Sequence, residues 1–366
     1  MMDKGMKKIT TRQLIIFYCI YSFSIKFLSL PHLLALGAGH GAWIAAGIGT
    51  ALELGVLFLA LNVLAIGNGS DLYSDLRANT KWVGAKFLIL LMLLVFLLQL
   101  FILMGQTNSL MVGTLFDKLN VHKFLVPLLL LGILFCFMPA RAIFRGGEVF
   151  FLLIIIGLAL SVFPALGNIR FGEFSRTFDG GAWPIFETVF RYLIYFESAA
   201  FLLVFSGDIK VTKDFRKKFM GAATAVGLFF FFFVFMFIGV FGPLAPIKNV
   251  AITDFTVHGA FLVQSGRLDW VLICIWLLLL LVRFGATFYA CFACLRYLFN
   301  IKHRAGYIGF GIAVFLYLMY YFLFASPRTL DDFIRTMAIP IAVLFFLVPV
   351  ACFVNAMILK RRRRNV

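Results

Sequence analysis

Long apolar runs separated by short polar intervals make up most of this chain. A helix needs about 20 apolar residues to cross the ~30 Å hydrocarbon core of a bilayer. Continuous runs of this length are typical of membrane helices, whereas a transmembrane β-barrel would show short alternating segments. The pattern predicts an all-α multi-pass membrane protein with ten transmembrane helices. The ten stretches are 11–36, 42–66, 85–112, 122–139, 147–167, 184–206, 216–242, 268–298, 306–325 and 334–359.

The basic residues predict the orientation of these helices. Lys and Arg gather in alternate intervals, including the segment before the first helix and the run Lys360–Arg364. Because cytoplasmic loops retain basic residues, we expect both termini to be cytoplasmic, which requires an even number of helices. The basic tail, 360–366, is expected mainly to fix this topology. Recruitment of anionic lipid or of an acidic partner is the alternative.

Composition narrows the class of protein. Apolar residues make up 63% of the chain and charged residues 13%, against roughly 45–50% and 25% in soluble domains. The 33 Lys+Arg against 16 Asp+Glu would suit a nucleic-acid-binding protein, but no soluble face exists to carry such a site. We therefore expect no nucleic-acid partner and a single transmembrane domain over residues 1–366, surrounded by membrane lipids.

Motifs of enzymes and metal sites are missing from the sequence. The cysteines all lie in apolar stretches, so no disulfide framework is indicated. Cys291 and Cys294 form a CxxC within a predicted helix, without a second pair, and are expected to serve packing. With no P-loop, nucleophile elbow or metal-ligand spacing, the sequence predicts no enzyme, no cofactor and no metal site.

Charged residues inside the predicted helices are the main functional candidates, because a charge facing lipid costs about 2.5–3.5 kcal/mol. We expect them to form a coupling or ion-pair network, with Lys26 paired to Glu197 or Glu53. Arg283 has two interpretations, a ligand carboxylate or pairing with Glu53, and the second is slightly favoured. A purely structural network is the alternative for the whole set. Its members are Lys26, Glu53, Arg191, Glu197 and Arg283.

Two of the predicted helices carry polar residues at their centres. Ser24, Ser29 and Pro31 surround Lys26 in the first, and the pair Glu197-Ser198 lies in the sixth, where no Gly or Pro marks a break. Transporters built from inverted repeats place their sites at broken helices in corresponding positions of the two halves.

The first and sixth helices correspond if the chain consists of two sets of five, repeat one over about 11–167 and repeat two over about 184–359. Amides elsewhere in the spans suit helix-to-helix hydrogen bonds or a polar pathway equally well. They are Asn62, Gln99, Gln106 and Asn108.

Several separated motifs resemble the spore germination permeases, the B subunits of GerA-type germinant receptors, within the amino acid/polyamine/organocation transporter superfamily. Members often have other residues at Ser24, Lys26, Gly41 and Phe196, and the glycines that mark their breaks are missing here. The matching segments are Ile9–Leu14, Leu28–Pro31 with Ala42–Ile44, Tyr195–Glu197 with Leu202–Phe205, and Arg267–Asp269 with Trp276.

The resemblance implies a 5+5 inverted-repeat (LeuT-type) fold in the inner membrane of an endospore, with a pocket for a small germinant such as an amino acid. It also implies A-type and lipoprotein C-type receptor subunits as partners. Whether such a subunit transports or only senses its ligand stays open.

We expect the germinant to bind at the centre of the fold, and the Lys26 ammonium at the first break to stand where relatives in the superfamily hold a sodium ion or the amine of the substrate. Two alternatives remain: a proton-coupled amino acid permease for nutrient uptake, and a scaffold subunit with a vestigial pocket. The expected substrate-binding residues are Ser24, Lys26, Ser29, Glu197, Ser198 and Arg283.

Overall fold

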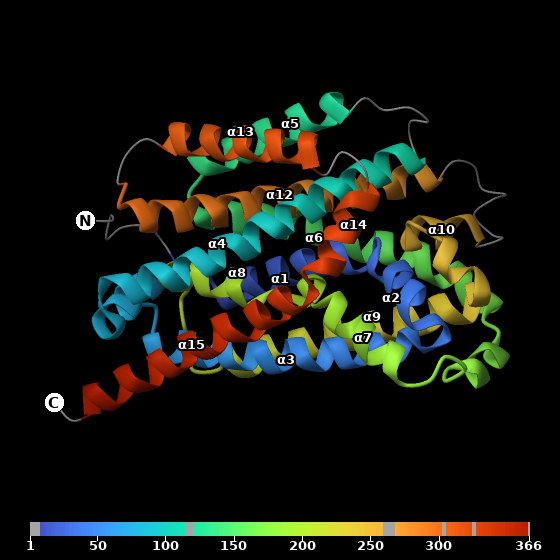
Figure 1. Cartoon of the computed structure of the whole chain (residues 1–366), viewed down its shortest axis with the longest axis horizontal. Coiled ribbons are helices and arrows are strands. Elements are labelled where there is room, and N and C mark those ends of the chain that lie inside the picture. Colours follow the sequence, from blue (N-terminus) through green and yellow to red (C-terminus); the bar gives the residue numbers. More distant parts are fainter. Residues whose placement is uncertain (1–7, 115–120, 259–267, 302–304, 324–326, 365–366) are drawn as a thin grey trace.

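A computed structural model describes residues 8–114, 121–258, 268–301, 305–323 and 327–364. The described chain is helical apart from turns and one isolated β-bridge. Its long helices run roughly along one axis (Figure 1). The helices longer than 15 residues are α1 (Thr11–Lys26), α3 (Ala42–Gly67), α4 (Leu72–Thr114), α5 (Val121–Phe137), α6 (Ala140–Val162), α9 (Phe215–Phe241), α12 (Leu268–Phe299), α13 (Ala305–Leu323) and α15 (Ala338–Arg364).

Shorter helices continue or connect these elements. The first and sixth predicted spans are each divided, into α1 and α2 and into α7, η4 and α8. The connections between spans hold further short helices, α10 and α14 among them. The bounds are α2 (Leu30–Ala38), α7 (Trp183–Arg191), the 3₁₀ helix η4 (Leu193–Phe196), α8 (Ala199–Val204), α10 (Ala251–His258) and α14 (Pro327–Thr336).

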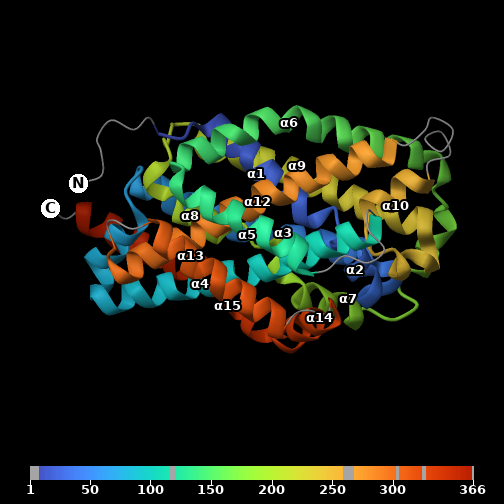
Figure 2. The ribbon, with the colours of Figure 1, turned by 90° about the horizontal axis from the view of Figure 1, so that it is seen from above.

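Two groups of helices pack against each other. In one, α3 packs on α9 and α1 on both α9 and α6; in the other, α12 packs on α4 and α5, and α5 on α13. The two groups meet where α12 contacts α1 and α6, and α15 packs on both α3 and α4. In both views α2, α7 and α10 gather at one end of the molecule (Figures 1 and 2), while α1 begins and α15 ends at the other (Figure 1).

Seven helices among the described residues are long and apolar enough to cross a membrane. They confirm a multi-pass membrane protein. The predicted spans that do not reach this length are the fourth, which is short, and the first and sixth, which are interrupted. α4 starts at Leu72, 13 residues before the predicted start at 85, because its first turns are polar and carry no hydropathy signal. The number of ten crossings remains a prediction.

Candidate functional site

The first helix is interrupted between Lys26 and Leu30. Pro31 has no N–H for the carbonyl of Phe27, and its ring would clash there, so α1 cannot continue. The backbone carbonyl of Leu28 instead accepts from the N–H of Ala251 at 2.8 Å, at the start of α10. The interruption is therefore set by proline chemistry and held open by a distant segment.

The sixth helix is interrupted at Glu197 and Ser198, although neither is a glycine or proline. The Glu197 side chain accepts from the backbone N–H of Ala200 at 2.7 Å, which satisfies a donor at the start of α8. From α4, the amide of Gln99 donates to the Glu197 carbonyl at 3.1 Å and to its carboxylate at 2.9 Å. Polar side chains thus satisfy backbone groups that a continuous helix would have paired.

A buried ion pair joins the two interruptions. Lys26 in the last turn of α1 pairs with Glu53 of α3, and their side chains are 1% and 3% exposed. The other Glu53 oxygen accepts from the hydroxyl of Ser198 at 3.0 Å and from that of Tyr18 at 3.3 Å. The Lys26 ammonium also lies 5.2 Å from the centre of the Phe196 ring, a favourable cation–π position. Of the two partners expected for Lys26, the structure thus places Glu53 in contact with it.

Arg283 of α12 contacts α1 at Tyr21. Its buried guanidinium donates to the carbonyl of Tyr21 and lies 3.8 Å over the Tyr21 ring. The Tyr21 carbonyl also accepts from Ser24 at 3.1 Å, and the Tyr21 hydroxyl donates to Gln99. The slightly favoured pairing of Arg283 with Glu53 is not found, because that carboxylate pairs with Lys26. The Nε and Nη2 groups of Arg283 have no partner among the described residues.

Arg191 stands apart from this cluster, contrary to the expectation of one network. It ends α7 and pairs with Glu187 four residues earlier, with the two side chains 20% and 50% exposed. Because a helical side chain points back along its own helix, Arg191 reaches the preceding turn. It does not contact Lys26, Glu53 or Glu197.

A cavity of about 720 Å³ begins at the first interruption and extends toward α14. Leu28 and Ser29 line the cavity at the interruption. Gln106 of α4 also lines it and donates a hydrogen bond to the Ser29 hydroxyl at 2.5 Å, which connects α4 to the interruption. Of the expected substrate-binding residues only Ser29 lines this cavity. The others are buried, and Glu197 lines a separate cavity of about 20 Å³. The polar lining residues are Ser29, His32, Gln106, Asn108, Ser109, Tyr195, Asn249 and Asp331.

Most of these lining residues were missed from the sequence. Gln106 and Asn108 were noted only as amides within a span, and their spacing of two residues near the end of an apolar run was the available signal. His32 follows Pro31 directly, so the sequence could also have predicted that His32 lies beside the interruption. Asp331 belongs to a separate short helix, and nothing in the sequence relates it to the first span.

At the opposite end of the molecule, the start of α1 contacts the segment after α8. Ile9 forms a parallel β-bridge with Ile209, with hydrogen bonds of 2.8 Å to the Asp208 carbonyl and 2.9 Å from the Lys210 N–H. Nearby, the Tyr297 hydroxyl donates to Asp71 at 2.5 Å. Burial raises the pKa of both Asp71 and Asp208.

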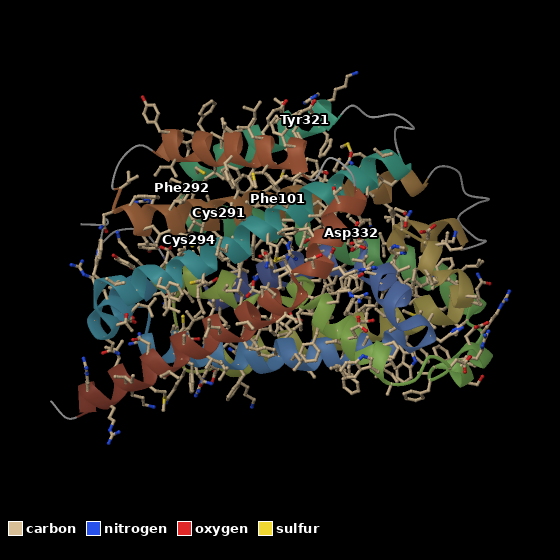
Figure 3. The ribbon with its side chains drawn as sticks, viewed as in Figure 1. Phe101, Cys291, Phe292, Cys294, Tyr321 and Asp332 are labelled. Atoms are coloured by element: carbon tan, nitrogen blue, oxygen red, sulfur yellow. The ribbon has the colours of Figure 1, made fainter. Side chains whose placement is uncertain are left out.

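No group of residues suited to a metal ion occurs in the described part of the chain. Cys291 and Cys294 lie along α12 as free, buried thiols (Figure 3), so they contribute packing there. Trp276 is buried in the same helix, whereas Arg267–Asp269, quoted above as part of the resemblance, lies outside the residues whose side chains are described.

The interrupted helices, the buried charges and the helix packing define a multi-pass membrane protein with transporter architecture. Solved transporters share this fold. A nucleobase-cation-symport-1 family transporter, Mhp1, in a closed conformation with bromovinylhydantoin bound is 16% identical, with a TM-score of 0.57 over 93% of this chain and 78% of that chain. A substrate-bound, outward-open Na⁺-coupled sialic acid symporter is 14% identical, with a TM-score of 0.61 over 91% and 78%. A variant of the manganese transporter of Eremococcus coleocola is 11% identical, with a TM-score of 0.57 over 95% and 85%.

The chain belongs to the spore germination protein family, whose permease model matches residues 8–328. This match confirms the resemblance found in the sequence. It also confirms that the chain belongs to a class of transporter-like proteins and not of enzymes. No curated protein matches the chain.

Proposed function

We propose that this protein is the permease-like subunit of a nutrient germinant receptor in the inner membrane of the endospore, and that it binds a small germinant such as an amino acid. One observation carries the proposal: two interrupted helices meet at a buried charge cluster beside a cavity of about 720 Å³. Transporter folds place their ligands at such interruptions, and a cavity of this size suits a small molecule.

The proposal includes ten crossings in two inverted repeats, about 11–167 and 184–359, with both termini cytoplasmic. The position of the interruptions in the first and sixth spans supports the repeats. The start of α1 and the end of α15 lie at one end of the molecule (Figure 1), as an even number of crossings requires. The cavity then lies on the side of the membrane away from the cytoplasm. A nutrient would reach the protein from that side.

Lys26 is assigned the role of coupling the two interruptions, through Glu53 to Ser198, without a sodium ion. A lysine in a low-dielectric site loses its proton more readily than one in water, so ligand binding beside it can be coupled to its protonation. We expect Lys26→Ala to abolish the germination response. Lys26→Arg should not restore it, because a planar guanidinium does not fit the site of a compact ammonium. A normal response in Lys26→Ala would contradict this role.

Arg283 is assigned a positioning role instead of ligand contact. It does not line the cavity, and its guanidinium holds the carbonyl and the ring of Tyr21. Arg283→Lys should then weaken the packing of α1 on α12 without changing which ligand is recognised.

The decisive experiment is a ligand thermal-shift screen on the purified chain, comparing wild type with Glu197→Gln. A germinant should stabilise the wild type by mass action. Glu197→Gln should lower this stabilisation, because the interruption that Glu197 holds borders the site. No stabilisation by any nutrient would contradict a ligand-binding subunit and favour the scaffold alternative.

Two further measurements separate the alternatives for the biological role. Co-purification with A-type and lipoprotein C-type subunits is expected for a receptor subunit. Uptake of labelled amino acids by liposomes that contain this chain alone would favour a proton-coupled nutrient permease.

A further inference from the structure

The last turns of α15 are fixed to the start of α4 by two asparagines. The side-chain amide of Asn79 donates to the Asn355 carbonyl at 3.0 Å, and that of Asn355 donates to the Asp75 carbonyl at 3.2 Å. The first turns of α4 are polar, and its apolar run begins only at about residue 85. Because the hydrocarbon core selects apolar residues, Asn355 lies near the boundary between the hydrocarbon and the lipid headgroups.

An apolar stripe continues along α15 beyond this level. Val354, Met357 and Ile358 are 51%, 46% and 45% exposed, and the exposed Arg361 follows them. Residues at this spacing lie on one face of a helix, so the apolar stripe leads directly to a positive charge. A groove of about 480 Å³ runs along it, lined by Phe353, Val354, Met357, Ile358, Lys360 and Arg361.

The cationic end of this groove has no acid to balance it. α15 contains no Asp or Glu, and no ion pair to Lys360 or Arg361 occurs among the described residues. A molecule that matches the groove therefore brings negative charge and apolar surface together. Anionic phospholipids carry their phosphate directly beyond their acyl chains, which is the order in which α15 presents Arg361 beyond the apolar stripe.

We infer that this groove binds an anionic phospholipid, with Lys360 and Arg361 at the phosphate and the apolar stripe beside an acyl chain. A guanidinium can donate two parallel hydrogen bonds to phosphate oxygens, and basic pockets beside membrane helices bind such headgroups. The basic tail then has both of its expected uses, since Arg362–Arg364 remain to fix topology. The lipid site is independent of the germinant site.

The test measures lipid binding to the purified wild-type chain in a nonionic detergent by native mass spectrometry. The probes are dioleoyl phosphatidylglycerol, dioleoyl phosphatidylcholine and the short-chain dihexanoyl phosphatidylglycerol. The anionic dioleoyl lipid should bind at least about fivefold more tightly than the phosphatidylcholine, which has no net charge. It should bind at least about tenfold more tightly than the short-chain lipid, which buries less apolar surface.

Variants locate the site on α15. Arg361→Gln should weaken binding of the anionic dioleoyl lipid about fivefold, and Lys360→Gln combined with Arg361→Gln at least about tenfold. Arg362→Gln is the matched control: Arg362 is the next residue of the same helix and is also exposed, but it does not line the groove, so binding should not change. All of these variants keep at least two of the residues 362–364, so the orientation signal is retained.

Three results would overturn the inference. Equal binding of phosphatidylglycerol and phosphatidylcholine would exclude recognition of the anionic headgroup. Equal effects of Arg361→Gln and Arg362→Gln would mean that the tail acts only through its total charge. Binding of the short-chain lipid as tight as that of the dioleoyl lipid would mean a phosphate site without an apolar groove. None of these results affects the proposed germinant site, so the failure of one proposal is distinct from the failure of the other.

Discussion

The buried pair of Lys26 and Glu53 allows a quantitative prediction for Lys26→Met, which keeps most of the side-chain volume and removes the charge. Both side chains are at most 3% exposed, so water cannot solvate the carboxylate left behind. Removing one partner of a buried pair costs about 3–5 kcal/mol. Glu53 keeps its bonds from Ser198 and Tyr18, which places the expected loss near the lower limit, about 3 kcal/mol.

The assay is a double-mutant cycle of Lys26→Met and Glu53→Gln, read from reversible unfolding in mixed micelles by far-UV circular dichroism. Each single variant leaves one uncompensated charge, whereas the double variant leaves none. The double variant should therefore lose much less stability than the sum of the singles. Lys218→Met is the control, because Lys218 and its partner Asp214 are 65% and 70% exposed and such pairs contribute at most about 1 kcal/mol.

Additive losses in this cycle would refute the reasoning. So would a Lys26→Met variant as stable as the wild type. Either result would mean that the two charges do not depend on each other in the folded protein, and that the interruptions are not joined through them.

Three further predictions test other parts of the structure. Gln99→Leu should cost about 2–4 kcal/mol in the same unfolding assay, because the Glu197 carbonyl and carboxylate each lose a donor; a loss below 1 kcal/mol would contradict that role. Pro31→Ala supplies the missing N–H and removes the ring clash, so amide exchange around residues 27–31 should slow while the ligand response falls; unchanged exchange would show that proline does not cause the break. Burial raises the pKa of Asp208 and Asp71 above the unfolded values, so their contribution to stability is fully present below the unfolded pKa and is lost as pH rises through the folded pKa. Asp208→Asn should therefore flatten the decline in stability above about pH 4, and an unchanged profile would be the contrary result.

Hydropathy located the helices well where an apolar run coincides with a whole helix. The predicted 216–242 and the observed Phe215–Phe241 of α9 differ by one residue at each end. The polar first turns of α4 and the helical continuation of α15 through Arg364 were not predictable in this way, because a helix can extend beyond the bilayer on polar residues. Hydropathy along the sequence indicates which residues lie in lipid, and it does not indicate how long the helix is.

The two interruptions differed in how far the sequence could predict them. Pro31 marks the first, since its effect on the preceding turn is local. The second depends on Gln99, which lies 98 residues before Glu197, and on a carboxylate that bonds the backbone three residues later. Neither contact leaves a local pattern. Lys26 and Glu53 were recognisable as buried charges because a charge within an apolar run is a local signal. The cavity wall was not recognisable, because its residues come from α2, α4 and α14, which are far apart in the sequence.

The β-bridge between Ile9 and Ile209 has a mechanical consequence. It ties the start of α1 to the segment that follows α8, so one half of each interrupted helix is fastened to the other at the end farthest from the cavity. A rearrangement that admits water from that end must either break the hydrogen bonds around Ile9 or move α1 and α8 together as one rigid unit. In the second case, a movement of α1 or α8 at one interruption also moves the other helix at its own interruption.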